Sequence, residues 1–197
     1  MSKDWNHNIY YHDRILHAVP KPCLYALDIG CGDGLLSRKL APHCGYVTGI
    51  DLDTTMLSVA EEYPNTPENI NYLEGDVMSY PFRESSFNLI AVVATLHHLP
   101  LYAALQRLQQ LLAPGGVLVI VGLYKENGIG DFIRFAAAFP ISRLMRWLHH
   151  DQKMDAPIKP PKETFAEIRN AASALMPGTV IKRQFFYRYS LTWLKPE

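Results

Sequence analysis

With 197 residues, of which 48% are hydrophobic, the chain is long enough for one domain with a sizeable core. Its 19 Lys and Arg balance its 19 Asp and Glu, so the sequence lacks the basic excess that favours nucleic-acid binding. No apolar run approaches the length of a membrane span, and the polar first residues contain no signal-peptide core. The three cysteines have no metal-ligand spacing, so we expect no metal site and a reducing, cytoplasmic location.

The first 21 residues are rich in aromatic residues and histidine, and we expect a helix there that ends at Pro20 and Pro22. Its apolar side chains recur at helical spacing, at Tyr11, Ile15, Leu16 and Val19. Such a stripe is typical of a helix that packs on a core. Three residues of the segment are alternative candidates for contact with a ligand: His7, Tyr11 and His12.

The stretch Leu24–Ser37 predicts a buried strand, a glycine turn and the start of a helix. Leu24–Ile29 is apolar except at Asp28, as in a strand that is buried on both faces of a parallel sheet. Glycines follow at alternate positions: Gly30, Gly32 and Gly34. Glycine allows positive φ and lets the backbone lie directly against a ligand, because it has no Cβ. This order is typical of the first half of a nucleotide-binding βαβ unit, although an ordinary βα turn has the same outline.

Four more strands are expected along the chain, at residues 46–50, 70–73, 87–94 and 117–123. The second strand of the chain ends on Asp51, where a carboxylate can accept both hydroxyls of a ribose. The third ends before Asp76 and Val77, and the fifth follows the sequence L-A-P-G-G. The repeated alternation of strands with helical segments indicates an α/β protein with a parallel sheet.

In chain order the motifs read D-x-G-x-G-x-G, G-I-D, G-D-V, F-N-L-I and L-x-P-G-G. This order resembles the class I S-adenosylmethionine-dependent methyltransferases of the small-molecule type, by motif over about residues 20–123 and by layout beyond. The resemblance implies a Rossmann-like α/β fold with a seven-stranded, mainly parallel sheet, helices on both faces and an antiparallel C-terminal hairpin. It also implies S-adenosyl-L-methionine as cofactor, S-adenosyl-L-homocysteine as product, and methyl transfer to a small-molecule acceptor by in-line displacement.

The same resemblance implies how the motif residues hold the cofactor. Asp28 would meet the ammonium of the methionine moiety, and Asp51 would accept from the ribose. Asp76 would accept from the exocyclic amine of adenine, while the backbone N–H of Val77 donates to a ring nitrogen. The cofactor-binding residues are therefore expected to be Asp28, Gly30, Cys31, Gly32, Gly34, Asp51, Leu52, Met56, Asp76, Val77 and Val93.

Several of these assignments have a plainer alternative. Leu52 and Met56 would line the adenine, but Met56 could equally be a core residue. Asp76 could be an exposed turn residue. Cys31 lies between two glycines, and no nearby basic residue activates its thiol, so we expect its backbone to matter and not its sulfur. Asp53 or Thr54 is the expected N-cap of the helix that follows Asp51.

The end of the fourth strand, near Val93, is expected to lie closest to the transferable methyl. His97 follows, and an imidazole there could take a proton from an oxygen or nitrogen nucleophile, so it is the candidate general base. Alternatively, His97 and His98 pack against the next helix, whose apolar stripe is Leu101, Leu105, Leu108 and Leu112. Asn88 stands where the family usually has Asp, so no role that needs a negative charge is assigned there.

Residues 124–162 interrupt the alternation of strands and helices. Pro140 divides an apolar, arginine-containing segment into two expected short helices. The resembled enzymes often build a substrate lid at this point, so we expect a lid-like insertion; extra core and a helix that rests on a membrane are the alternatives. We expect a single domain over residues 1–197, with residues 1–21 as a cap helix.

A helix over residues 163–175 and two strands, over 179–187 and around 189–193, close the chain. Their connection is too short for a crossover, so these strands must be antiparallel. That hairpin, and a Gly34 that follows Gly32 by two residues instead of three, disfavour a nicotinamide-dependent oxidoreductase. A cofactor-binding module without catalysis remains the second alternative, because its motifs would look the same. The sequence leaves the oligomeric state open.

Overall fold

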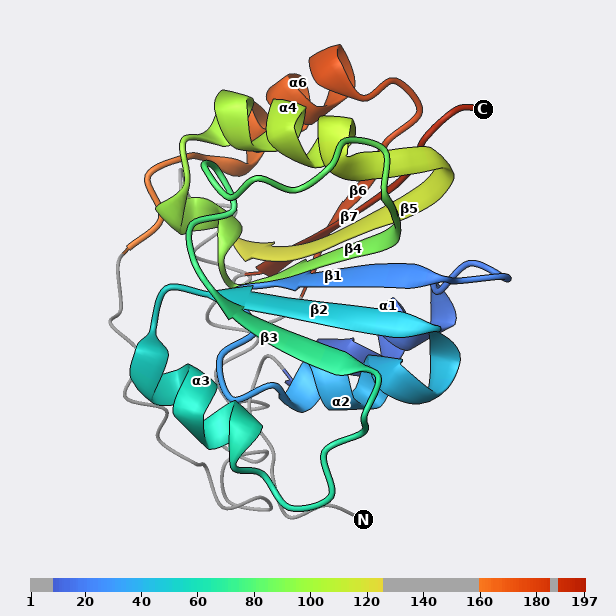
Figure 1. Ribbon diagram of the computed structural model, residues 1–197. Coiled ribbons are helices and arrows are strands. Elements are labelled where there is room, and N and C mark those ends of the chain that lie inside the picture. Colours follow the sequence, from blue (N-terminus) through green and yellow to red (C-terminus); the bar gives the residue numbers. More distant parts are fainter. Residues whose placement is uncertain (1–8, 126–159, 185–187) are drawn as a thin grey trace.

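The computed structural model describes residues 9–125, 160–184 and 188–197, and a seven-stranded sheet forms its centre (Figure 1). The strand order is β3-β2-β1-β4-β5-β7-β6. The strands are β1 Tyr25–Ile29, β2 Tyr46–Asp51, β3 Ile70–Glu74, β4 Phe87–Val93, β5 Leu112–Leu123, β6 Val180–Arg183 and β7 Arg188–Leu194. Neighbours among β1 to β5 pair in parallel, whereas β7 is antiparallel to both β5 and β6. The predicted fold, including the closing antiparallel hairpin, is confirmed.

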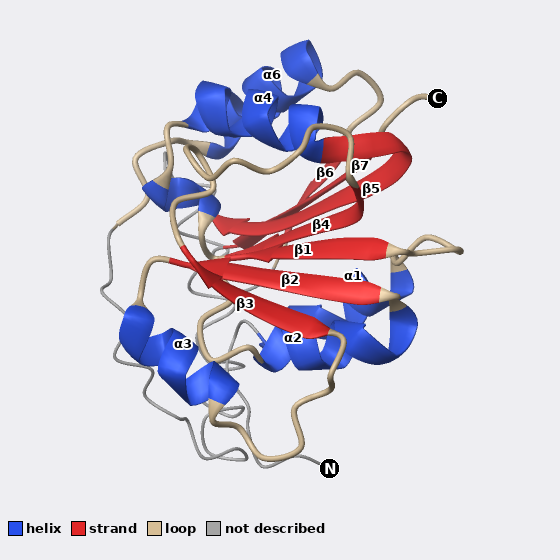
Figure 2. Ribbon diagram, in the orientation of Figure 1, coloured by secondary structure: helices blue, strands red, loops and turns tan. Residues whose placement is uncertain are grey.

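Helices cover both faces of the sheet (Figure 2). They are η1 Ile9–Tyr11, α1 His12–His17, α2 Leu35–Leu40, η2 Ala41–His43, α3 Thr54–Glu61, η3 Leu96–His98, α4 Leu101–Leu111 and α6 Phe165–Leu175. The helices α4 and α6 lie together over one face, and α1, α2 and α3 lie over the other. We call these the α4 face and the α1 face.

Each face of the sheet has its own apolar core, and β5 contributes to both by strict alternation. Leu118 and Ile120 of β5 belong to the α4-face core, whereas Val119 and Val121 belong to the α1-face core. The N-terminal helix completes the α1-face core, because Tyr11 and its predicted stripe partner Ile15 are both buried in it. The expected N-terminal helix is therefore present, as η1 and α1, although residues 1–8, which include His7, lie outside the described part of the chain.

The boundary between α4 and β5 differs from the expectation. The apolar spacing predicts a helix that includes Leu112, but α4 ends at Leu111, and Leu112 is the buried first residue of β5. Pro114 cannot continue a helix and disfavours helical backbone at Ala113, so α4 has to end before that residue. Leu112 accordingly has extended backbone angles, with φ −71° and ψ 133°. The strand expected to begin at Val117 therefore begins earlier.

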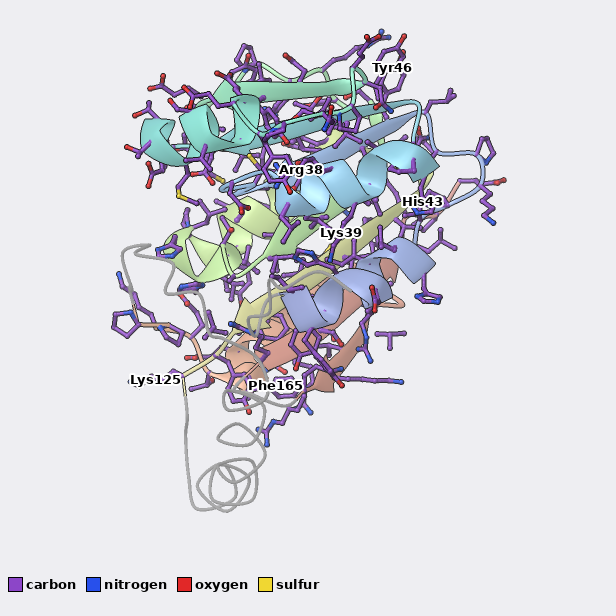
Figure 3. All side chains as sticks on the ribbon, turned by 90° about the horizontal axis from the view of Figure 1, so that it is seen from below. Arg38, Lys39, His43, Tyr46, Lys125 and Phe165 are labelled. Atoms are coloured by element: carbon purple, nitrogen blue, oxygen red, sulfur yellow. The ribbon has the colours of Figure 1, made fainter. Side chains whose placement is uncertain are left out.

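Other boundaries shift by fewer residues. The fourth strand ends at Val93, because Ala94 has a φ of 52° and leaves the strand. Of the segment predicted as a lid, residues 126–159 lie outside the described part of the chain. Its first residues contact the start of α6. The Tyr124 and Phe165 ring centroids are 5.6 Å apart, and Lys125 forms an isolated parallel β-bridge with Thr164, the N-cap of α6 (Figure 3).

Two polar side chains fix where elements begin. Asp53 caps α3 by accepting from the backbone N–H groups of Thr55 and Met56, at 3.0 and 3.2 Å, as one of the two expected caps. The side-chain carbonyl oxygen of Asn88 accepts from the backbone N–H groups of Leu24 and Tyr25, each at 3.0 Å. A neutral acceptor is sufficient for this contact, which explains why the departure from the family's usual Asp is tolerated.

Candidate cofactor and active site

The predicted site residues follow strands whose carboxyl ends meet at one edge of the sheet. Ile29 at the end of β1 pairs with Ile50 of β2 and Val92 of β4. Asp51 at the end of β2 pairs with Glu74 at the end of β3. Because these ends are level, the loops that follow them lie side by side, and a ligand can contact several of them at once.

The glycine loop after β1 turns back toward β2. The backbone N–H groups of Gly30 and Cys31 both donate to the carbonyl of Ile50, at 2.8 and 3.2 Å. A Cβ at Gly30 would collide with Thr95. At Gly32, which has a φ of 52°, the nearest atom that a Cβ would meet is the Met56 Cε at 3.7 Å. The backbone of Gly32 therefore faces open space, as close approach of a ligand requires.

Asp51 connects the two loops that flank this space. Its Oδ2 accepts a 2.7 Å hydrogen bond from the backbone N–H of Gly32, and its Oδ1 accepts a 3.0 Å bond from the N–H of Asp53. A carboxylate has about four lone-pair sites, so two more donors can still be accommodated. Leu52, which is 68% exposed, and the half-buried Met56 add apolar surface next to it. The combination suits a ribose with an attached aromatic base.

Asp28 differs from Asp51 because it is buried. Only 2% of its surface is exposed, and its Oδ2 accepts a 2.7 Å hydrogen bond from the hydroxyl of Ser37 in α2. Burial, opposed by the hydrogen bond from Ser37 and assisted by the charge of Asp51, raises the pKa of the Asp28 carboxyl to about 7. A cation that binds here would stabilise the charged carboxylate.

Asp76 forms a tight turn after β3. Its Oδ1 accepts from the N–H of Met78 at 2.9 Å, and its carbonyl accepts from the N–H of Tyr80 at 2.7 Å. Arg107 in α4 holds the turn by donating hydrogen bonds to the backbone carbonyls of Val77 and Tyr80, at 3.3 and 2.6 Å. The Val77 side chain is buried in the α4-face core, so only its backbone is available to a ligand.

The end of β4 lies against the glycine loop. Ala94, a non-glycine residue with positive φ, is held by its N–H, which donates to the carbonyl of Val121 at 2.8 Å. Thr95 follows, donates from its hydroxyl to the carbonyl of Val93 at 2.9 Å, and packs on Gly30. A strained residue that is held in this way at a strand end is common beside functional sites. His97, half-buried in η3, comes next, with its ring centroid 4.0 Å from that of His98.

The sequence is similar to proteins of one family. Residues 27–120 match the family described as "Methyltransferase domain". An uncharacterized methyltransferase of Mycobacterium tuberculosis is 37% identical over 204 residues, which cover 100% of this chain and 100% of that protein. The chain belongs to the class I S-adenosylmethionine-dependent methyltransferases. Its cofactor is S-adenosylmethionine.

Other similarities to this methyltransferase either cover a smaller part of the chain or have a lower sequence identity. The demethylmenaquinone methyltransferase of Staphylococcus aureus is 38% identical over 99 residues, 48% of this chain and 41% of that protein. The structure of N-methyltransferase NodS from Bradyrhizobium japonicum WM9 with S-adenosyl-l-homocysteine has a TM-score of 0.64 at 20% identity, covering 96% of this chain and 87% of that chain. The PH0226 protein from Pyrococcus horikoshii OT3 has a TM-score of 0.69 at 18% identity, covering 96% and 89%. At such identities the structural likeness concerns the fold.

The methyltransferase fold brings most of the predicted cofactor residues to one place. Those after β1 and β2 surround the space in front of Gly32, and Asp76 and Val77 stand at the adjacent strand end. The thiol of Cys31 points elsewhere: a Cβ at Gly49 would meet its sulfur at 3.0 Å, and burial raises the pKa of this thiol. That Cys31 contacts the cofactor through its backbone and not through its sulfur stays a prediction.

Supporting residues of the loop were missed from the sequence. Arg38 of α2 donates to the carbonyl of Asp33 at 2.6 Å and stacks over the Tyr63 ring at 3.7 Å (Figure 3). Tyr72 of β3 packs on Gly34, and Thr95 packs on Gly30. None of these contacts has a sequence signal, because each one depends on which loops meet in the folded protein.

The remaining ligand candidates of the first helix are core residues. His12 is 5% exposed, and burial, with help from Lys39 on α2, lowers its pKa to about 3 (Figure 3). It is therefore neutral and packed at ordinary pH. Within the described residues, no cluster of His, Cys, Asp or Glu is arranged to hold a metal ion, and no helix has the length and apolarity to cross a membrane.

Asp51→Ala should weaken S-adenosylhomocysteine binding by about 10- to 100-fold, because hydrogen bonds to a charged acceptor contribute about 1.5–3 kcal/mol. Asp53→Ala is the matched control, since it removes the neighbouring carboxylate and costs α3 its cap, about 1 kcal/mol, but keeps the ribose acceptor. Calorimetry measures both affinities. If Asp51→Ala stays within twofold of the parent, the ribose lies elsewhere.

Asp28 should give the cofactor-free protein a pH-dependent stability that Asp28→Asn removes. The pKa of this carboxyl is about 7 in the folded protein, against 3.8 for an ordinary aspartate, so the folded state holds the proton to higher pH. Its contribution to stability is complete below about pH 4 and is lost as the pH rises through about 7. Thermal melts of parent and variant across this range measure the difference.

S-adenosylhomocysteine binding should show the opposite trend, because its ammonium favours the charged carboxylate. The affinity should fall by up to about tenfold for each pH unit below about 7, and binding should release protons near neutral pH. Calorimetry in buffers of different ionisation enthalpy detects both effects. Equal pH dependence in parent and Asp28→Asn would show that Asp28 does not meet the ammonium.

Proposed function

We propose that this chain transfers a methyl group from S-adenosylmethionine to a small-molecule acceptor by in-line displacement. The observation that carries the proposal is the contact between the end of β4 and the glycine loop, where Thr95 packs on Gly30. A cofactor held by the glycine loop thus lies next to Val93 and Thr95. This is also where η3 begins, so its His97 is near the same edge of the sheet.

The bound cofactor supplies an electrophilic methyl on a sulfonium, and the thioether that leaves needs no acid. The chain's own residues therefore have to orient the two reactants and limit the access of water. Asp28 and Asp51 would fix the two ends of the cofactor, and Leu52 and Met56 would cover its base. Asp76 and the backbone of Val77 would select adenine.

The balanced charge of the chain supports a small molecule over nucleic acid as acceptor. One relative is named for demethylmenaquinone and one similar structure is named as an N-methyltransferase, so the cofactor half of this fold serves different acceptors. We place the reaction in the cytoplasm, because Cys23, Cys31 and Cys44 are free thiols, which a reducing compartment preserves. We treat residues 1–197 as one domain with a cap helix at 1–21 and a lid at 124–162.

Isotopically labelled S-adenosylmethionine, incubated with the protein and a metabolite extract, should label one acceptor or a small set of related acceptors. Gly32→Val is the control, because a branched residue is strained at a φ of 52° and fills the space in front of the loop. Mass spectrometry identifies the product. Cofactor binding without label transfer to any small molecule would favour a binding module, and labelling of nucleic acid would refute the acceptor class.

His97 is the candidate base if the acceptor must lose a proton during transfer. His97→Ala should then lower kcat by about 10²–10⁴-fold, with unchanged melting temperature and cofactor affinity. His98→Ala is the matched control, because its exposed ring adjoins that of His97. A loss of less than tenfold in folded His97→Ala would make His97 a packing residue.

A further inference from the structure

A buried guanidinium lies at the carboxyl edge of the sheet, away from the cofactor motifs. Arg188 is the first residue of β7, and only 8% of its surface is exposed. Its Nε and Nη1 atoms are buried and have no hydrogen-bond partner among the residues that the structure describes. Arginine remains protonated in proteins, so it cannot reduce the cost of burial by losing its charge. A buried charge in this situation calls for an anion.

The alternation of β7 decides which face Arg188 occupies. Tyr189 packs in the α4-face core with Ile168, so Arg188 and Ser190 point to the opposite side. Ser190 accepts a 2.6 Å hydrogen bond from Nη1 of Arg14, which belongs to α1. Arg188 therefore lies on the α1 face, the face that also holds Asp28 and its partner helix α2.

The register places Arg188 within reach of the end of β4. Val93 of β4 pairs with Val121 of β5, and Val121 pairs with Ser190 of β7. Arg188 is the next residue of β7 on the same face, level with Leu123. With strands about 4.8 Å apart and about 3.3 Å per residue, the Cα atoms of Val93 and Arg188 are about 12 Å apart. An arginine side chain and a small acceptor together span this distance.

Among the described ionisable groups, Tyr11 acts on Arg188 and is also close to Arg14. Burial raises the pKa of Tyr11 to about 12 although Arg188 and Arg14 lower it, so its hydroxyl keeps the proton. Burial lowers the pKa of Arg188 and Tyr11 raises it, and no acidic side chain in the described ranges contributes. The position thus combines a planar, five-donor cation with a phenolic hydroxyl.

We propose that Arg188 binds an anionic group of the methyl acceptor, a carboxylate or a phosphate, on the α1 face beside the end of β4. The inference rests on the proposed methyl transfer and adds the charge of the acceptor to it. A guanidinium binds either anion through two parallel hydrogen bonds, which also orients the acceptor. The anionic end would sit at β7, and the atom to be methylated would point toward β4.

The test measures probe binding to the full chain saturated with S-adenosylhomocysteine, using butyrate, butyl phosphate and uncharged butyramide. The parent should bind one of the anions at least about tenfold more tightly than butyramide, since charge-assisted hydrogen bonds are strong. Arg188→Met should lose this preference. Arg188→Lys should keep part of it, because lysine keeps the positive charge but lacks the planar guanidinium that forms two parallel hydrogen bonds. Arg169→Met, an exposed arginine on α6, is the matched control and should behave as the parent.

Melting temperatures separate a binding role from a structural one. Without probe, Arg188→Met should melt at the same temperature as the parent or a few degrees higher, because an unpaired buried charge is replaced by an apolar side chain. Bound anion should raise the melting temperature of the parent only. The proposal is overturned by a parent without anion preference, by an equal preference in Arg188→Met, or by a large fall in its melting temperature. Failure of the parent to bind S-adenosylhomocysteine would instead refute the proposed function.

Discussion

One backbone carbonyl, that of Ile50 in β2, fixes the path of the glycine loop. It accepts from the N–H groups of both Gly30 and Cys31, so the chain bends toward β2 as soon as it leaves β1. This bend brings the N–H of Gly32 to the carboxylate of Asp51. A donor at the loop and an acceptor at the neighbouring strand are thus locked in one geometry before any ligand arrives, which reduces the entropy lost on binding.

The same bend determines which side chains must fit beneath the loop. Cys31 has to turn its side chain inward, and it fits only because Gly49 on β2 has no Cβ. Tyr72 also packs on Gly49, and its hydroxyl reaches Gly34 at the other end of the loop. Gly49, the first residue of the G-I-D motif, thus leaves room for two side chains that pack beneath the loop. Thr95 packs on the loop at Gly30 and Tyr72 packs on it at Gly34, whereas the space at Gly32 stays open.

The sequence was most informative where chemistry and spacing coincide. Strand ends followed by glycines or acids predicted the sheet and the positions of Asp28 and Asp51, because the backbone itself dictates what can stand there. It was misleading at Leu112, whose apolar spacing continued the helix until a proline two residues later ended it. It was silent on Thr95 and Arg188, because packing on Gly30 and burial without an anion are properties of the assembled sheet. The sequence therefore predicted the position of the cofactor motifs more fully than the residues that could bind the methyl acceptor.

The hydrogen bond between Arg14 and Ser190 joins residues that are 176 positions apart. A ribosome releases the N-terminal end first, so β1 to β5 and their loops can assemble while the last strand is still being made. The strand β7 must then enter between β5 and β6, and its arrival supplies Ser190 as the hydrogen-bond partner of Arg14 in α1. The nascent methyltransferase can therefore complete its predicted cofactor motifs before it acquires the strand that carries Arg188.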